Sequence, residues 1–298
     1  MIDGVGLRLS KNRERDMSYG YGQRRRRSSG GLKLRLIIAV VMVLFTLFSY
    51  MRMGQTNPVT GERQRVAMTA EQEIAMGLQA APEMANQHGG LYPDQRSQQN
   101  VDTVGDRLLM ALDGWLRERG KTNPFRFEFH LLRDPQTVNA FALPGGQVFI
   151  TYALYSQLET EGQLAGVLGH EIGHVLSRHG AQRMAKQKLT QGLVGAAGVA
   201  GGGYDSAQLA NFVGQFINMK YGRGDELESD KWGVLLTVEA GYDPRAMFGL
   251  MDILDRSSGG QGPPEMISTH PKPANRKEYI QEVLEQVFPR GVPDGLQP

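Results

Sequence analysis

Residues 170–174 read HEIGH, a pattern whose chemistry requires an α-helix. At 100° per residue, His170 and His174 lie about 40° apart on one helical face, one turn from each other. Two ring nitrogens placed in this way can bind one tetrahedral Zn²⁺. Glu171 projects about 60° to the side of His174, where it can take a proton from a zinc-bound water. This HExxH arrangement is typical of zinc peptidases.

The residues around this pattern favour a helix. Three glycines, Gly166, Gly169 and Gly173, each cost about 1 kcal/mol relative to alanine in a helix, so we expect them to let another backbone approach closely. The alternative is a core helix whose two histidines are hydrogen-bonded without a metal. A buried glutamate beside them disfavours this alternative, because an unpaired buried charge is costly. The apolar residues follow helical spacing, at Leu164, Val167, Leu168, Ile172, Val175 and Leu176.

A third metal ligand has to come from another part of the chain. The metzincin pattern would need Gly at 177 and His at 180, where this chain has Ser177 and Gly180. His179 lies five residues after His174, about 140° around a continuous helix. It is therefore predicted to point away from the metal.

A second helix, predicted over 221–241, offers two carboxylates one turn apart. Asp225 lies in its first turn and Gly241 ends it. Glu226 and Asp230 share one face, which suggests a zinc ligand and a carboxylate that orients a ligand histidine. A solvated acidic helix start explains the same residues equally well, because carboxylates stabilise the positive end of a helix.

Four sequence blocks, in this order, resemble the membrane-associated zinc metallopeptidases that include HtpX and the CAAX prenyl proteases. They are residues 139–151 before the zinc helix, the zinc-helix block 170–183, the ExxxD block 226–230 and the HPxxxxR block 269–276. The resemblance extends over residues 60–285, with Ser229 as a departure where relatives usually carry Ala. It implies a gluzincin fold, α+β and mainly helical, with a small sheet beside the HExxH helix.

The resemblance also implies roles for individual residues. One Zn²⁺ would be held by His170, His174 and Glu226. Asp230 would orient one of these ligands through a hydrogen bond. Glu171 would activate the water in the fourth position for attack on a peptide carbonyl and return the proton to the leaving amine.

Two further residues receive less direct support. The resemblance implies that His270 faces the zinc, where it could hydrogen-bond the oxyanion of the tetrahedral intermediate or occupy the open position until substrate arrives. A His-Pro dipeptide is otherwise ordinary turn chemistry. Arg223, one turn before Glu226, could hold a carboxylate or a substrate carbonyl, or be a surface arginine at the helix start.

Residues 145–152 predict a glycine turn followed by a short strand rich in β-branched and aromatic residues. An extended peptide could pair with such an edge strand and present its scissile carbonyl to the zinc. The alternative is an ordinary strand inside the sheet. The expected substrate-binding residues are Gly146, Gln147, Val148 and Phe149.

The N-terminal region predicts a membrane anchor. The first 35 residues contain ten Lys or Arg against three Asp or Glu, a net charge of +7, whereas the whole chain carries +2. Sixteen uncharged, mainly apolar residues follow, 36–51, close to the minimum of about 17 for a span. Snorkelling arginines extend this stretch, so we expect a transmembrane signal anchor over 34–53. Residues 1–33 would then be a basic, disordered segment in the cytoplasm, with the remainder across the membrane.

A cleaved signal peptide is disfavoured, because residues 49–54 offer no A-x-A-like site. The chain has no cysteine, which excludes disulfides and a thioether-linked lipid. We therefore predict a single-pass protein of a bacterial inner membrane with a periplasmic peptidase domain. The arginine run 24–27 could alternatively bind nucleic acid, but its position beside the apolar stretch favours the membrane.

Residues 54–288 are long enough for one peptidase domain, and 289–298 are expected to form a flexible tail. The Gly/Ala-rich segment 192–203 is too short to cross a bilayer, so we predict a mobile flap or lid over the cleft that could touch lipid. The expected elements of the domain include helices over 70–81 and 98–119 and strands near 125–132 and 147–152.

Together these features predict a membrane-anchored zinc endopeptidase. From the resemblance alone, its substrates would be misfolded or unassembled membrane and envelope proteins. Prenyl-peptide cleavage is disfavoured, because that branch uses a multi-span intramembrane chamber. The main alternative is a membrane-tethered chaperone or assembly factor whose proteolysis is latent or secondary.

Overall fold

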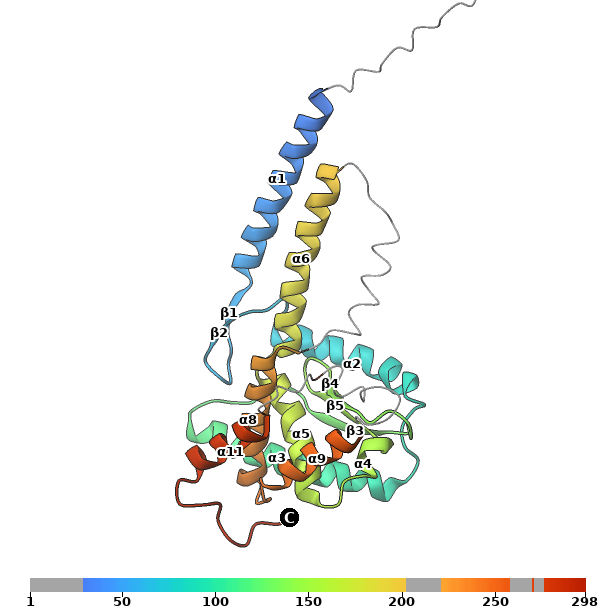
Figure 1. The fold of residues 1–298 in the computed structure, drawn as a ribbon, viewed down its shortest axis with the longest axis vertical. Helices are drawn as coiled ribbons and strands as arrows, with labels where there is room; N and C mark the ends of the chain where they lie inside the picture. Colours follow the sequence, from blue (N-terminus) through green and yellow to red (C-terminus); the bar gives the residue numbers. More distant parts are fainter. Residues whose placement is uncertain (1–28, 202–220, 258–269, 271–275) are drawn as a thin grey trace, which may run out of the picture.

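The computed structural model describes residues 29–201, 221–257, 270 and 276–298. It has a mainly helical α+β domain, as the sequence predicted, from which two long helices project, α1 (Ser29–Arg52) and α6 (His179–Gly201) (Figure 1). The domain's described helices are α2 (Ala70–Gln87), α3 (Gln95–Glu118), α4 (Tyr152–Tyr155), α5 (Glu161–Leu176), α8 (Arg223–Glu239), α9 (Ala246–Ser257) and α11 (Arg276–Val287). Its described strands are β1 (Gly54–Thr56), β2 (Arg63–Arg65), β3 (Glu128–Leu132), β4 (Ala140–Ala142) and β5 (Gln147–Thr151).

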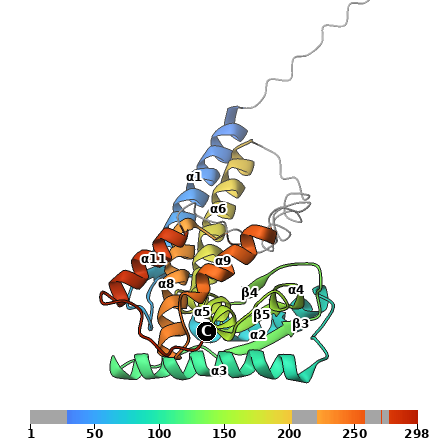
Figure 2. The ribbon, with the colours of Figure 1, turned by 60° about the horizontal axis from the view of Figure 1, so that its bottom comes forward.

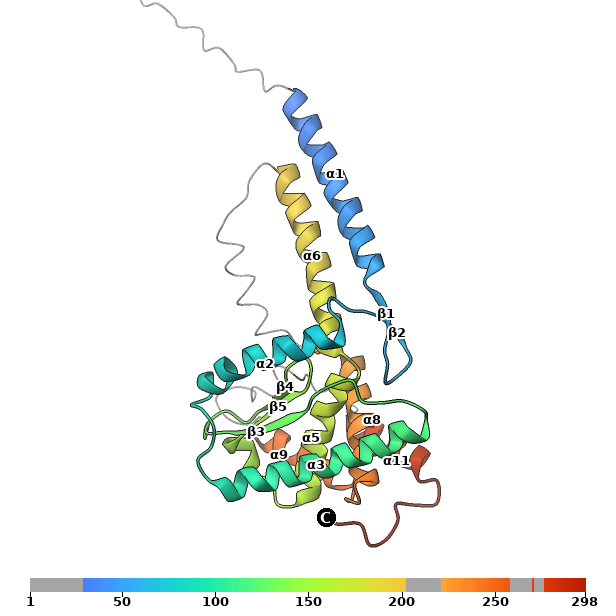
Figure 3. The ribbon, with the colours of Figure 1, turned by 180° about the vertical axis from the view of Figure 1, so that it is seen from behind.

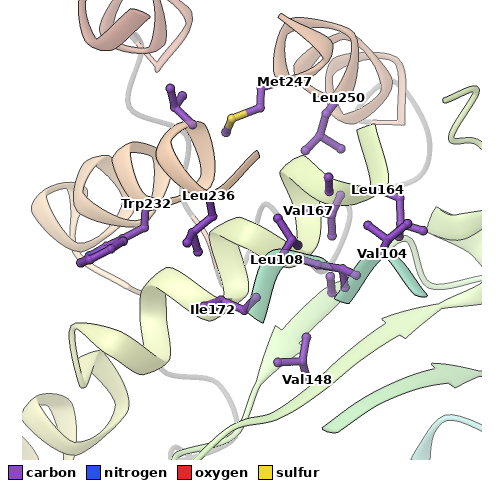
Figure 4. Packing of buried hydrophobic residues seen from close by; sticks show 14 of the residues in the cluster. Val104, Leu108, Val148, Leu164, Val167, Ile172, Trp232, Leu236, Met247 and Leu250 are labelled. Atoms are coloured by element: carbon purple, nitrogen blue, oxygen red, sulfur yellow. The ribbon is translucent and has the colours of Figure 1, made fainter. Parts of the chain in front are cut away.

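Helix α5, which carries the HExxH pattern, lies in the middle of the domain (Figure 2). Its first turn is capped by the Thr160 hydroxyl, which accepts a hydrogen bond from the Gln163 backbone N–H. Helix α3 crosses α5 on one side, and α8 and α9 pack against it elsewhere. In the core, Ile172 of α5 lies near Leu108 of α3 and Leu236 of α8 (Figure 4). Helices α3, α8 and α9 thus cover α5, and His170 and His174 on α5 are buried away from bulk water.

The glycines of α5 allow α8 to approach closely, as predicted. A Cβ atom added at Gly169 would lie 3.2 Å from the Gly233 Cα atom. One added at Gly173 would lie 3.0 Å from the Ser229 Cα atom. Because both distances are shorter than ordinary carbon–carbon contacts, only glycine lets the two helices pack at this separation.

Helices α2 and α3 confirm the two helices predicted before the sheet. Thr69 and Gln72 form a capping box at the start of α2, and the Asp94 carboxylate caps α3 by accepting from the Ser97 N–H. The sequence-based prediction ended the first helix at Ala81. The helix instead continues through Pro82 to Gln87.

The three-stranded sheet has the order β3-β5-β4, with β5 parallel to β3 and antiparallel to β4. All five residues of β5 are buried, because a strand lies on each side and helices α2 and α5 contact it. The predicted substrate-binding residues Gly146, Gln147, Val148 and Phe149 therefore do not form an edge strand, and that prediction is wrong. Among the described strands, the sheet edge near the zinc helix belongs to β4, which contacts α5.

A hairpin made by β1 and β2 follows α1 and holds the C-terminal end of α5. The Asn57 side-chain amide donates to the Leu176 carbonyl at 2.8 Å, and the Gln64 amide donates to the Ser177 carbonyl at 3.1 Å. These are carbonyls that a helix end leaves without intrahelical partners. Arg178, with φ of +55°, turns the chain sharply here, and its buried guanidinium pairs with Glu73. The chain that leaves α1 is thereby tied to the helix that carries the site.

Two predictions about irregular segments are corrected by the structure. Residues 192–201 are the end of α6, which runs beside α1 away from the domain, and they form no flap over the site (Figure 3). The last ten residues are irregular but attached, since the Gln297 carbonyl accepts from the Asp243 N–H and the Pro298 carbonyl accepts from the Gly162 N–H. The basic residues 1–28 lie outside the described part of the chain.

Candidate active site

Four buried side chains from three parts of the chain converge beside α5. They are His170 and His174 of α5, Glu226 of α8, and His270, and their ligand atoms all lie within 4.8 Å of one another. The two Nε2 atoms of His170 and His174 are 3.1 Å apart. The Glu226 carboxylate oxygens lie 3.5 Å from the first ring and 3.6 Å from the second. The one-turn spacing predicted for the two histidines thus brings both Nε2 atoms to one point.

This cluster has the properties of a metal site. Two ring nitrogens that face each other cannot both carry a proton, and a positive ion between them removes the conflict. Among the described residues, Glu226 Oε2 and His270 Nε2 are buried without a hydrogen-bond partner, which is costly unless another group satisfies them. Imidazole nitrogens with one carboxylate form a donor set that suits Zn²⁺, so the residues fit a metal ion of this kind.

Glu171 lies beside the cluster without taking part in it. Its carboxylate is completely buried, and neither oxygen has a hydrogen-bond partner among the described residues. The His270 ring lies close to it, with Nε2 3.8 Å from Glu171 Oε1. Burial raises the pKa of Glu171 above the ordinary value for a glutamate. A carboxyl group in these surroundings can both accept and return a proton.

Asp230 supports the cluster from behind His170, as predicted. Its Oδ1 atom accepts a hydrogen bond from His170 Nδ1 at 2.9 Å, which leaves Nε2 of that ring free to bind a metal. Arg276, the last residue of the HPxxxxR block, donates to both Asp230 oxygens at 2.8 and 2.5 Å. Burial raises the pKa of Asp230, but the Arg276 charge and the hydrogen bonds from His170 and Arg276 outweigh it and keep the pKa below its ordinary value. Arg276 was not among the predicted site residues.

His179 performs the corresponding role for His174. It stays outside the metal cluster, as predicted, but it lies against His174 instead of turning away from the site. Its Nδ1 atom lies 2.9 Å from His174 Nδ1, and its Nε2 atom lies 3.3 Å from Glu228 Oε2. The prediction assumed one continuous helix, whereas α5 ends at Leu176 and α6 begins at His179 after the left-handed Arg178. If His174 Nδ1 donates to His179, and His179 Nε2 donates to Glu228, His174 Nε2 is left free for the metal.

Tyr221 is a further residue that the sequence did not reveal. Its ring stacks on His174 with 3.8 Å between centroids, and the Arg183 guanidinium lies 3.7 Å from the Tyr221 centroid. Burial raises the pKa of Tyr221 to about 12, so its hydroxyl stays protonated near neutral pH. The stacked ring fixes the plane of His174 and shields it from water.

The two less supported predictions have different outcomes. His270 lies in the cluster, with its Nδ1 atom 3.1 Å from Glu226 Oε1 and only 1% of its surface exposed. Arg223 is exposed at the first residue of α8 and makes no hydrogen bond or ion pair with any described residue. The structure therefore brings His270 to the site but leaves Arg223 outside it.

Comparisons with known proteins agree with this geometry. Residues 95–284 match the model of a protein family described as peptidase family M48. The chain is 31% identical over 245 residues to the β-barrel assembly-enhancing protease of Yersinia pestis, covering 78% of this chain and 48% of that protein. It is 35% identical over 231 residues to the mitochondrial metalloendopeptidase OMA1 of Schizosaccharomyces pombe, covering 76% and 65%. The match to the Escherichia coli β-barrel assembly-enhancing protease is 29% over 265 residues, covering 82% and 52%. The chain thus spans about half to two thirds of the length of these relatives.

Proposed function

The chain belongs to peptidase family M48, and we propose that it is a zinc-dependent endopeptidase anchored in a membrane. The observation that carries this proposal is the convergence of His170, His174 and Glu226 beside Glu171, which is buried and has no hydrogen-bond partner in the described part of the chain. A structural cluster would pair its carboxylates internally, whereas this one leaves the Glu171 carboxylate available. That arrangement suits hydrolysis, which needs metal ligands and a separate proton acceptor.

The chain's own residues supply the proton transfers and the positioning. Zn²⁺ held by His170, His174 and Glu226 would polarise the peptide carbonyl and lower the pKa of a water molecule. Glu171 takes the proton from the attacking water and delivers it to the leaving amine. The raised pKa of Glu171 suits this double role, because the carboxyl group has to hold the proton between the two steps.

His270 is proposed as the residue that closes the site at rest. Its unpartnered Nε2 atom belongs to a ring whose other nitrogen lies 3.1 Å from Glu226. In this position His270 would occupy the place that water or substrate needs. A peptide that displaces it would open the site, and the freed imidazole could then donate to the oxyanion.

The outer edge of β4 is the proposed docking strand for the substrate backbone. The Leu143 N–H donates to the Gln147 carbonyl, so by antiparallel alternation the backbone groups of Ala142 point away from β5. Ala142 and Leu143 line a small cavity together with His174 and Tyr221. An extended peptide added to this edge would therefore pass the metal cluster.

Replacing Ala142 by proline tests this strand. Proline removes one outward-facing N–H and is tolerated on an edge strand, so folding should be preserved. We expect kcat/KM for a peptide substrate to fall about 2- to 10-fold through the loss of one hydrogen bond. The thermal unfolding temperature and metal content serve as controls and should stay at the wild-type values. Unchanged kcat/KM with folding intact would rule out this docking strand.

The membrane location is proposed from α1. Residues Gly31–Arg52 form a helix long and apolar enough to cross a membrane, with a mean hydropathy of 2.3 and 6% of that window buried. The basic residues before it favour a cytoplasmic N-terminus, which would put the peptidase domain in the periplasm of a bacterial inner membrane. Substrates would then be misfolded or unassembled membrane and envelope proteins, in keeping with two relatives that are named for β-barrel assembly.

A membrane-tethered chaperone with latent proteolysis is the second candidate. The observation that favours it is the closed position of His270, because a site shut by its own side chain could bind clients without cutting them. In cells, a Glu171→Gln variant that supports normal envelope assembly would favour the chaperone. Loss of the cellular function in that variant would favour the peptidase.

Metal removal tests the peptidase directly. The full chain, purified in detergent, is expected to contain one Zn²⁺ and to cleave casein. A chelator should abolish cleavage and lower the thermal unfolding temperature, since four buried side chains would lose their common partner. Added Zn²⁺ should restore both, whereas added Mg²⁺ should not. A metal-free chain that is equally active would refute the proposed mechanism.

A further inference from the structure

Helices α1 and α6 lie side by side along their length and run in opposite directions (Figures 1 and 3). Their interface is made by small residues. A Cβ atom added at Gly192 of α6 would collide with the Thr46 side chain of α1. Ala196 of α6 is 1% exposed, and Ala39 of α1 is 8% exposed. Small residues that let two backbones approach closely are typical of helix pairs inside membranes.

The opposite face of α6 is apolar and uncovered. Leu193 is 38% exposed and Val194 is 56% exposed, with no described element packed over them. Residues 192–201 consist only of Gly, Ala, Val and Leu. In water this surface would be unfavourable, and α1, which packs against α6, also exposes apolar side chains. These include Leu36, Ile37, Val40, Val41, Leu44, Phe45 and Phe48.

The charges of the two helices mark a common boundary near the domain. Gly192 of α6 and Thr46 of α1 are in contact, so these two residues lie at the same height along the two helix axes. Six residues toward the domain from each lie Lys186 on α6 and Arg52 on α1, both about 9 Å from this contact. Basic side chains at one level on neighbouring helices are expected where a membrane meets water.

The far ends of the apolar stretches also correspond. Nine residues beyond Gly192 lies Gly201, the last residue of α6, and nine residues before Thr46 lies Ile37. Ile37 is two residues from Arg35, which ends the apolar stretch of α1. From Lys188, the last basic residue before the apolar stretch of α6, to Gly201 the helix rises about 20 Å, close to the rise of about 22 Å from Leu36 to Met51 of α1.

We propose that residues 189–201 of α6 are embedded in the same bilayer as α1, with lipid acyl chains covering Leu193 and Val194. The inference rests on the proposed anchor, because it takes its depth from α1. The segment 192–203 is too short to cross a bilayer by itself, and the proposal does not require it to cross alone. Packed against α1, the short and glycine-rich helix needs to bury only one face in lipid.

The embedded helix would fix the height of the active site above the membrane. His179, which bonds His174, begins α6 and lies seven residues before Lys186. This separation corresponds to about 10 Å along the helix axis. An extended peptide covers that distance with about three residues. The site would therefore accept protein segments that lie immediately outside the bilayer.

Because the chain has no cysteine, single cysteines can carry a spin label without background. Val194→Cys reports on α6. Leu44→Cys lies at the same level on α1, two residues from Thr46, and is also exposed. Glu118→Cys, on the exposed end of α3, reports on water. The labelled full-length chains are reconstituted into phospholipid vesicles, and collisions with oxygen, which enters lipid, and with a water-soluble nickel complex are measured for each.

We expect the labels at 194 and 44 to lose accessibility to the nickel complex and to lie at the same depth in the bilayer. The label at 118 should remain accessible to the nickel complex. If the label at 194 is as accessible to nickel as the label at 118, while the label at 44 is in lipid, α6 is not embedded but α1 is still a membrane anchor. Nickel access at both 194 and 44 would overturn the inference together with the anchor.

Discussion

Replacing Glu171 by glutamine is expected to lower kcat for peptide hydrolysis by about two to four orders of magnitude. The glutamine side chain has nearly the same shape but cannot take a proton from the attacking water. The Zn²⁺ content should stay at one per chain, since Glu171 lies outside the cluster of His170, His174, Glu226 and His270. Initial rates of casein cleavage and metal analysis of the same preparations provide the measurement.

The matched control is Glu118→Gln on the exposed end of α3, which should leave both quantities unchanged. The unfolding temperature of Glu171→Gln should not decrease, because the wild-type carboxylate is buried without a hydrogen-bond partner among the described residues. Full activity of Glu171→Gln with Zn²⁺ bound would mean that another group accepts the proton. Loss of Zn²⁺ would instead make Glu171 a structural part of the metal site.

The metal-binding part of the site was predictable because it depends on local periodicity. His170 and His174 share a face in any α-helix, and so do Glu226 and Asp230. These spacings do not show that the helix with Glu226 packs against the helix with the two histidines. For Glu226, the family resemblance decided between a metal ligand and a solvated helix start. His270 was found in the same way, because a single histidine in a loop has no periodic signal.

The residues that were missed depend on where elements end and how they assemble. His179 could be placed only by knowing that α5 stops at Leu176 and that Arg178 adopts a left-handed conformation. The strand β5 was assigned to an edge, because a short run such as QVFIT does not distinguish an edge strand from a central one. Its complete burial became visible only in the structure. The end of α6 was predicted as a flap, because its helical state depends on contact with α1, far away in the sequence.

The second prediction with a large effect concerns the glycines of α5, which allow α8 to approach closely. Replacing Gly173 by alanine is expected to destabilise the domain by about 1–3 kcal/mol. The new methyl group would lie 2.8 Å from Trp232 Cβ and 3.1 Å from the Ser229 carbonyl oxygen. Helix α8 would have to move away from α5, and Glu226 would move with it. We therefore expect weaker Zn²⁺ binding together with a lower unfolding temperature, measured by circular dichroism and metal titration in detergent.

Gly114→Ala is the matched control, since Gly114 also lies inside a helix but has no atom within 4 Å of an added Cβ. Alanine favours helix over glycine by about 1 kcal/mol, so this variant should be more stable than the wild type and bind Zn²⁺ equally well. The two substitutions are chemically identical but should change the free energy of unfolding in opposite directions, because only Gly173 faces another backbone. If Gly173→Ala were also stabilising, the α5–α8 separation would not depend on glycine, and the placement of Glu226 beside the two histidines would need another explanation.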